Sequence, residues 1–383
     1  MPKLQSLDIC LDNPTRVYFP RQTISGQLIL KLEKTVRVRG IRLKFKGVSN
    51  VTWTVGGGEN SRTVSAKEEY FNFVTLLCGR LPGGDGEDID IQTGSYVYGF
   101  TFVLPDSDIP TSYMDEIGDV MYSIKATVDR QMAKDYKTTT FFTVLNALDL
   151  NTIPGAGTPA QLQQSKTVCC LCCASGPVTG VFRIDKRGYV PGEFIVIDGE
   201  VVNESSRTIV SIKAKLKMET TYQAGTDKTV RSKTAAKLED KGIGPMESAT
   251  WVGERLEVPS LATSSLAGCS LIDIRYVLKV TADIKDTPFD LTISLPITVG
   301  TLPVIAGPTG QFSQQTQAVS FQATSEQVVV KQPTSEVQSP TPSYVECVFS
   351  QKDRQNETNQ HATLTYTPSY PYYNHNPTDN ENK

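Results

Sequence analysis

The fold is decided by the stretch Val36-Arg37-Val38-Arg39-Gly40-Ile41-Arg42-Leu43-Lys44-Phe45-Lys46, in which apolar and basic residues alternate with one slip at Gly40. This period of two is typical of a half-buried β-strand, and the slip predicts a β-bulge. Proline, glycine and aspartate separate further runs of this kind, and no long stretch keeps a helical period. We therefore predict an all-β chain of sandwich type. The other runs are Gln27–Leu32, Tyr98–Leu104, Tyr122–Val128, Phe194–Val202 and Tyr276–Ala282.

Parts of this pattern return later in the chain at two constant offsets. The segment Ile41–Lys46 returns as Ile212–Lys217, an offset of 171, and Tyr122–Lys125 returns as Tyr276–Lys279, an offset of 154. Because the matches keep their order, a duplication explains them, and 383 residues suffice for two domains and a remainder. We expect two tandem immunoglobulin-like sandwiches. The 17 residues missing from the second copy are expected in the glycine-rich loops 56–58 or 82–86 of the first.

The composition changes beyond Thr301. Of the 73 residues from Gln311 to Lys383, 40 are Gln, Ser, Thr, Asn or Pro and 11 are Leu, Ile, Val or Phe. A segment of this kind buries too little apolar surface to offset its ordering entropy, so a disordered tail is expected. We divide the chain into a first sandwich at 1–160, a Cys-rich connection at 161–177, a second sandwich at 178–305 and the tail at 306–383.

Several classes of function are disfavoured by composition. The net charge is near −3, which argues against nucleic acid as a partner. The two histidines are His361 and His375, so an imidazole-based catalytic triad or zinc site would need a ligand or base from the tail. The N-terminus does not resemble a secretory signal, and no apolar run is long enough to span a bilayer. We expect a cytoplasmic protein without a cofactor.

A cysteine cluster offers four interpretations. It comprises Cys169, Cys170, Cys172 and Cys173, with two overlapping Cys-x-x-Cys spacings. Four sulfurs within five residues crowd a single turn, which disfavours a zinc site, and a redox pair would need a helix that this β-chain does not predict. Reversible lipidation is the third interpretation, and a structural role in an interdomain connection is the fourth. Cys269 is expected to open a strand and to be buried rather than reactive.

Five segments carry a family resemblance. In chain order they are Gly94–Pro105, Cys169–Pro177, Arg187–Glu193, Asn203–Arg207 and Leu295–Pro303. They resemble the arrestin-domain-containing proteins, or α-arrestins, and the resemblance covers nearly all of residues 5 to 305. The resemblance implies two β-sandwich arrestin domains and no catalytic site. It also implies a trafficking adaptor whose tail recruits WW-domain HECT-type ubiquitin ligases to membrane receptors or transporters for endocytosis and endosomal sorting. Membrane association would be peripheral, at the plasma membrane and endosomes.

One member of the family binds thioredoxin through a cysteine of its second domain. The segment most like that region here is Pro245–Trp251, which contains no cysteine. The resemblance therefore does not extend thioredoxin binding to this chain. A thiol redox or metal protein centred on Cys169–Cys173 remains the alternative from another functional class.

The family recruits WW domains through Pro-Pro-x-Tyr, in which tandem prolines hold an extended helix that fills an aromatic groove. The tail contains Thr341-Pro342-Ser343-Tyr344 and Thr367-Pro368-Ser369-Tyr370, each with threonine in place of the first proline. That loss costs about 1–2 kcal/mol, or roughly tenfold in affinity. Two motifs 26 residues apart could recover binding through avidity. We predict WW binding through Pro342, Tyr344, Pro368 and Tyr370; the alternatives are ordinary tail residues and a scaffold without ligase recruitment.

The basic residues of the deciding stretch are the last candidate site. Arg37, Arg39, Arg42, Lys44 and Lys46 are expected on one exposed face, with Lys213, Lys215 and Lys217 at the equivalent place in the second copy. Family resemblance and point charges on one strand suggest that they bind acidic or phosphorylated cargo. The alternative is structural, because Lys and Arg also protect exposed strands from edge-to-edge pairing.

Overall fold

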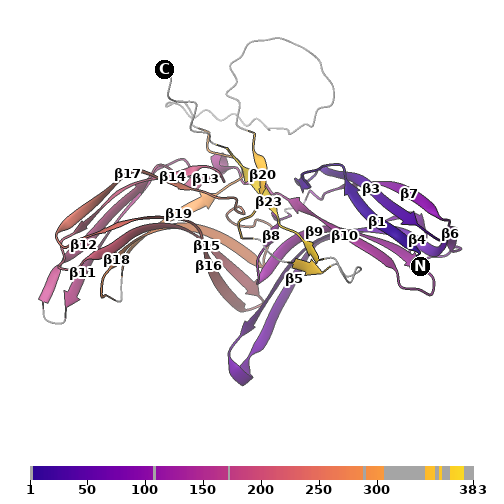
Figure 1. Cartoon of the computed structure of the whole chain (residues 1–383), viewed down its shortest axis with the longest axis horizontal. Helices are drawn as coiled ribbons and strands as arrows, with labels where there is room; N and C mark the ends of the chain where they lie inside the picture. Colours follow the sequence, from indigo (N-terminus) through magenta and orange to yellow (C-terminus); the bar gives the residue numbers. More distant parts are fainter. Residues whose placement is uncertain are drawn as a thin grey trace, which may run out of the picture.

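The chain folds into two β-sandwiches side by side, with two tail strands between them (Figure 1). The computed structural model describes residues 3–106, 109–170, 173–287, 290–305, 341–349, 353–355 and 363–374. Two short 3₁₀ turns, Gly58–Asn60 and Leu150–Thr152, interrupt the strands. The all-β prediction is confirmed. Within the described ranges, no helix is long and apolar enough to cross a membrane.

The first sandwich packs a three-stranded sheet on a larger one. The small sheet has the order β1 (Leu4–Leu11), β3 (Thr23–Leu32), β7 (Gly94–Val103). The large sheet has the order β2 (Val17–Tyr18), β10 (Tyr136–Val144), β9 (Gly118–Arg130), β4 (Val36–Val55), β5 (Arg62–Gly79), with β6 (Ile89–Ile91) beside β4 and β8 (Tyr113–Met114) beside β9. Phe45 of β4 stacks on Phe102 of β7 with 4.3 Å between ring centroids, so aromatic packing joins the two sheets.

The deciding stretch forms the first half of β4 and alternates as predicted. Its apolar side chains are buried, whereas Arg42, Lys44 and Lys46 are only partly covered. The ladder to β9 shifts register between Val38 and Gly40, which confirms the bulge. Glycine is required there because a Cβ would collide with the carbonyl oxygen of Arg80.

The second sandwich repeats the plan of the first. One sheet has the order β11 (Ala160–Cys170), β12 (Cys173–Ile184), β14 (Phe194–Asn203), β17 (Glu247–Glu257). The other has the order β13 (Gly188–Tyr189), β19 (Leu291–Val299), β18 (Ile272–Ile284), β15 (Ile209–Ala224), β16 (Asp227–Ile243). The segment 161–177, expected as a connection, instead supplies β11 and part of β12. These strands pair in antiparallel register, so their backbone hydrogen bonds place the segment inside the sandwich.

The two copies also share local details. The short strands β2 and β13 each pair in parallel with the last long strand of their sandwich. Tyr122 donates a hydrogen bond to Pro110 O at 2.6 Å, and Tyr276 donates one to Ala262 O at 2.8 Å. The equivalent tyrosines therefore hold equivalent loops, which supports the inferred duplication.

The domains meet across a seam that is both apolar and polar. Buried apolar residues of both sandwiches form one continuous core cluster. The hydroxyls of Tyr113 and Tyr222 lie 3.1 Å apart, and Lys233 Nζ lies 2.9 Å from the buried carboxylate of Asp115. Farther out, Arg62 on β5 forms a 2.6 Å ion pair with Asp227 on β16. These contacts join the domains at several points along the seam.

Candidate functional site

The two Thr-Pro-Ser-Tyr motifs pair with each other. Strand β20 (Ser343–Glu346) runs antiparallel to β23 (Ser369–Tyr372), with Tyr344 opposite Pro371 and Val345 opposite Tyr370. A second short pair, β21 (Asp353–Gln355) with β22 (Thr363–Thr365), lies between them in sequence. We call residues 343–348 and 366–373 the tail clasp. Figure 1 shows β20 and β23 in yellow between the two sandwiches.

These segments depart from the disordered character expected for 306–383. The average composition of the tail hides a local aromatic cluster of Tyr344, Tyr366, Tyr370, Tyr372 and Tyr373. Aromatic side chains bury large areas, so a few of them can offset the ordering of a short segment. This local aromatic density is the signal from which the clasp could have been predicted.

Tyr370 is the most deeply buried residue of the clasp. Its side chain is 1% exposed, and its hydroxyl donates a 2.9 Å hydrogen bond to Ser112 O in the first sandwich. Burial raises the pKa of Tyr370 well above its usual value. Pro368 is also buried, so the more C-terminal motif is covered at both of its recognition residues.

Tyr366 and Ser369 extend the contact with the first sandwich. The hydroxyl of Tyr366 donates to Phe142 O at 3.0 Å and lies 3.2 Å from Thr143 Oγ1. The Ser369 N–H donates to the same Thr143 oxygen at 3.3 Å. Burial raises the pKa of Tyr366 to about 12. The end of β10 therefore receives one edge of the clasp.

The second sandwich holds the other edge. Ser260 Oγ donates to Val345 O at 2.8 Å, and the Val348 N–H donates to Ser260 O at 3.2 Å. The Tyr373 N–H donates to Pro191 O at 2.9 Å, while its hydroxyl donates to Thr301 O at 2.7 Å. The clasp thus bonds to both domains.

Two further contacts shape this edge. The Tyr372 hydroxyl donates to the Glu257 carboxylate, and this hydrogen bond, with burial, raises the pKa of Tyr372 to about 12. Gly192 lies against the main chain of Tyr373 at a φ of +92°, where a Cβ would overlap the Tyr373 carbonyl.

Pro342 and Tyr344 of the first motif remain only partly covered. The two motifs are therefore unequal in exposure.

The predicted basic face is largely neutralised by internal ion pairs. Arg39 Nε and Arg42 Nη1 lie 2.7 and 2.8 Å from the two carboxylate oxygens of Asp129. Burial alone would raise the pKa of Asp129, but the hydrogen bonds from Arg42 and Arg39 outweigh it and lower the pKa. Arg37 lies 3.9 Å from Asp88. The three arginines of the face therefore have acidic partners within the first sandwich, and Arg39 and Arg42 make the shortest contacts.

Lys44 and Lys46 make up the rest of the face. Lys46 lies 3.7 Å from Glu69. The pKa of Lys46 is lowered, mainly by burial and secondly by the neighbouring Lys67. Lys44 lies directly opposite Lys125 on β9. Like charges directly opposite one another disfavour the pairing of these two strands.

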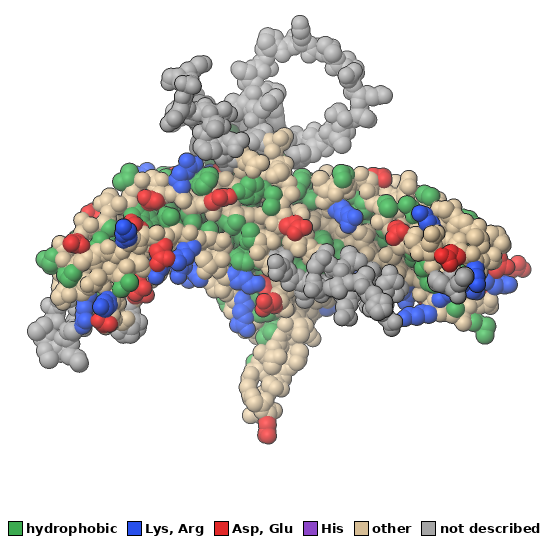
Figure 2. Space-filling model, in the orientation of Figure 1, with side chains coloured by type: hydrophobic (Ala, Val, Ile, Leu, Met, Phe, Trp, Pro, Cys, Tyr) green, Lys and Arg blue, Asp and Glu red, His purple; other side chains and the backbone are tan. Residues whose placement is uncertain are grey.

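The equivalent lysines of the second sandwich have a similar pattern. Lys213 is within 3.5 Å of both Glu239 and Asp283, whereas Lys215 lies opposite Lys237 and Lys279. Figure 2 shows basic side chains along the concave lower edge of the molecule, with acidic side chains among them. This mixture supports the structural interpretation for much of the face.

The cysteine cluster lies at the end of the β11–β12 hairpin. In the antiparallel register of the hairpin, the backbone of Cys170 lies opposite that of Cys173, and the backbone of Cys169 lies opposite that of Ala174. Cys172 falls outside the described residues. Among the described residues, no group of three or more His, Cys, Asp or Glu is placed to hold a metal ion. Cys269 precedes β18 rather than opening it, and is half-buried with Sγ 3.6 Å from Ser49 Oγ.

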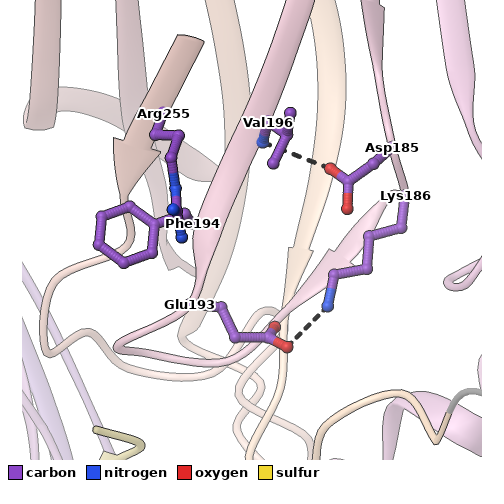
Figure 3. A pocket seen from close by; sticks show the side chains of 6 residues that line it. All are labelled: Asp185, Lys186, Glu193, Phe194, Val196 and Arg255. Carbon is purple, nitrogen blue, oxygen red and sulfur yellow. Dashed lines mark hydrogen bonds and ion pairs between the residues drawn. The ribbon is translucent and has the colours of Figure 1, made fainter. Parts of the chain in front are cut away.

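The second sandwich contains a pocket of about 200 Å³ that is lined by charged side chains (Figure 3). Lys186 Nζ lies 2.7 Å from Glu193, and Asp185 accepts a hydrogen bond from the Val196 N–H. Arg255 lies over the Phe194 ring, 4.3 Å from its centroid. Because each of these charged groups already has a partner within the protein, the pocket is a weaker candidate than the seam.

Comparisons with known proteins agree with this architecture. The family models "Arrestin (or S-antigen), N-terminal domain" and "Arrestin (or S-antigen), C-terminal domain" match residues 7–151 and 174–304. Arrestin domain-containing protein 4 of Mus musculus is 31% identical over 310 residues, covering 79% of this chain and 73% of that protein. Arrestin domain-containing protein 17 of Caenorhabditis elegans is 31% identical over 319 residues, with coverages of 80% and 72%. Thioredoxin-interacting protein of Homo sapiens is 27% identical over 318 residues, with coverages of 82% and 79%.

Proposed function

Because the chain belongs to the family of arrestin domain-containing proteins, the α-arrestins, we propose that it is a trafficking adaptor that links membrane receptors or transporters to ubiquitin ligases and endosomal sorting. The observation that carries this proposal is the match of both arrestin domains across the two sandwiches. Proteins of this family act as scaffolds and adaptors. In this proposal the chain joins two partners and performs no catalytic step. It is cytoplasmic and associates peripherally with the plasma membrane and endosomes.

The tail is the proposed ligase-binding element. Its two motifs keep the second proline and the tyrosine that a WW domain reads, as Pro342 with Tyr344 and Pro368 with Tyr370. The partner is a HECT-type ligase with several WW domains, because two weakened motifs on one chain gain from avidity. A scaffold that does not recruit a ligase is the competing function, since threonine replaces the first proline in both motifs.

A peptide titration separates these two functions. A synthetic peptide of residues 336–376 is titrated against a tandem WW protein by calorimetry, beside the same peptide with Tyr344→Ala and Tyr370→Ala. We expect the unchanged peptide to bind at least about tenfold more tightly, because each tyrosine fills a pocket of its own. Equal affinity of the two peptides would refute ligase recruitment.

The basic face of β4 is the proposed contact for acidic or phosphorylated cargo. Lys44 carries most of this proposal, because Arg39 and Arg42 already pair with Asp129. Lys44→Gln is expected to weaken binding of a phosphopeptide and to leave folding intact, whereas Lys31→Gln on β3, in the other sheet of the same sandwich, serves as the control. Unchanged phosphopeptide affinity for Lys44→Gln would leave the face with a structural role.

The cysteines of the β11–β12 hairpin are proposed as sites of reversible acylation. The four cysteines lie within five residues of one another in the sequence, and acyl chains on them would support peripheral membrane association. The experiment is metabolic labelling with an alkyne fatty acid, comparing the natural chain with one carrying serine at Cys169, Cys170, Cys172 and Cys173. Hydroxylamine-sensitive label that disappears in the variant is the expected result, and equal label in both chains contradicts the assignment.

A further inference from the structure

We propose that the seam between the two domains is a binding groove for an extended, tyrosine-rich peptide, that the tail clasp occupies it in cis, and that this occupancy excludes a WW domain from Tyr370. The exclusion of the WW domain rests on the proposed function. The groove itself does not, because it follows from the contacts of the clasp with the body.

The groove recognises tyrosine through main-chain carbonyl oxygens. The hydroxyls of Tyr366, Tyr370 and Tyr373 donate to the carbonyls of Phe142, Ser112 and Thr301, at 3.0, 2.9 and 2.7 Å. A buried carbonyl left without a donor is costly, so a phenylalanine of the same shape would fit but leave the acceptor unpaired. Three such contacts in one short segment give the groove selectivity for tyrosine over phenylalanine.

The groove also reads the peptide backbone. Thr143 accepts from the Ser369 N–H, Pro191 accepts from the Tyr373 N–H, and Ser260 donates to the Val345 carbonyl. With the clasp in place, Thr143 and Ser260 are only 3% and 2% exposed, so the clasp and the body together exclude water from these polar contacts. Gly192 adds room for the backbone at Tyr373, where any side chain would collide. Backbone contacts of this kind require an extended peptide.

Binding to the groove and binding to a WW domain are mutually exclusive for the second motif. A WW domain must contact the faces of Pro368 and Tyr370, and both residues are buried in the clasp. The affinity of the second motif for a WW domain, within the whole chain, is then its intrinsic affinity multiplied by the fraction of molecules in which the clasp is open. Because the clasp bonds to both domains, a partner that changes their relative placement would also change that fraction.

The groove is tested first by peptide binding in trans. The receptor is the full chain with Tyr366→Ala, Tyr370→Ala and Tyr373→Ala, whose own tail has lost the three hydroxyl contacts and therefore competes less well with a probe. The probe is a fluorescent peptide of residues 363–374. We expect saturable binding, and roughly tenfold or greater weakening when the three tyrosines of the probe are replaced by phenylalanine. No binding, or equal binding of the two probes, overturns the tyrosine-reading groove.

Occupancy in the natural chain is tested by hydrogen exchange of the full chain. Amides 369–373 are expected to exchange more slowly than in the free peptide. Thr143→Val should increase their exchange because it removes the partner of Ser369 and Tyr366, while Thr139→Val, on the same strand but outside the clasp contacts, should not. Exchange at the free-peptide rate in the natural chain refutes occupancy in cis.

Exclusion is tested by comparing WW affinities. Tyr344→Ala is introduced into both molecules, so that only the second motif is available. The peptide 336–376 is then expected to bind a single WW domain roughly tenfold more tightly than the full chain does, with Thr143→Val recovering part of the difference. Both molecules keep the second motif intact, so the difference reports its accessibility alone. Equal affinities refute exclusion. If neither the peptide nor the full chain binds the WW domain, ligase recruitment and exclusion are both refuted. The groove is then judged by hydrogen exchange and by peptide binding in trans.

Discussion

The hydroxyl of Tyr370 donates a hydrogen bond to the main-chain oxygen of Ser112, a residue 258 positions earlier in the chain. This contact ties a proposed recruitment motif to the domain seam. It also makes the motif a structural element of the folded body. Tyr370, the residue proposed to bind a WW domain, is therefore already bound by the protein's own first sandwich.

Tyr370→Phe is expected to loosen the clasp without disturbing either sandwich. The Ser112 carbonyl loses its donor in a buried place, which costs about 1–3 kcal/mol of clasp stability. The measurement is the rate of thermolysin cleavage of the full chain within residues 363–374 under native conditions. Tyr344→Phe is the control, since Tyr344 is only partly covered; faster cleavage in both variants to the same degree would contradict the special role of Tyr370.

The equivalent tyrosines Tyr122 and Tyr276 should contribute similarly to the two domains. Each donates to a loop carbonyl from a buried position, so Tyr122→Phe and Tyr276→Phe should each lower the free energy of unfolding by about 1–3 kcal/mol. Urea denaturation followed by tryptophan fluorescence gives the values. Tyr96→Phe, whose hydroxyl is at the surface, should change stability by less than about 0.5 kcal/mol. A large loss in only one of the two variants would contradict their equivalence.

Asp129→Asn should destabilise the first sandwich by about 2–3 kcal/mol, because two arginines lose their shared carboxylate. The folded pKa of Asp129 is lowered, so its contribution is fully present above the unfolded value near 3.9 and is lost as the pH falls through the folded value. Urea unfolding of both proteins at pH 7 and in steps below pH 4 measures this. The difference in free energy of unfolding between the natural chain and Asp129→Asn should become smaller as the pH falls. A difference that stays constant contradicts this pH dependence.

Glu257→Gln should return the pKa of Tyr372 toward the ordinary value for tyrosine. The hydrogen bond to Glu257 and burial raise the pKa of Tyr372 to about 12, and removing the carboxylate should return it toward about 10. Because the folded pKa is raised, the contribution of this contact is complete below pH about 10 and disappears toward pH 12. Tyrosinate absorbance during an alkaline titration detects the change. Glu254→Gln, on the same strand, should leave the titration unaltered.

The β-class, the duplication and the bulge at Gly40 could be predicted from the sequence, because an alternation with a period of two and segments repeated at constant offsets are visible in the order of the residues. The sequence also singled out Tyr344 and Tyr370. Three features were visible only in the folded protein. Strands within segment 161–177 belong to the second sandwich, Asp129 pairs with two arginines of the basic face, and the two motifs pair with each other at the domain seam. Each of these depends on partners far away in sequence, and burial against such partners cannot be read from the composition of the segment that is buried.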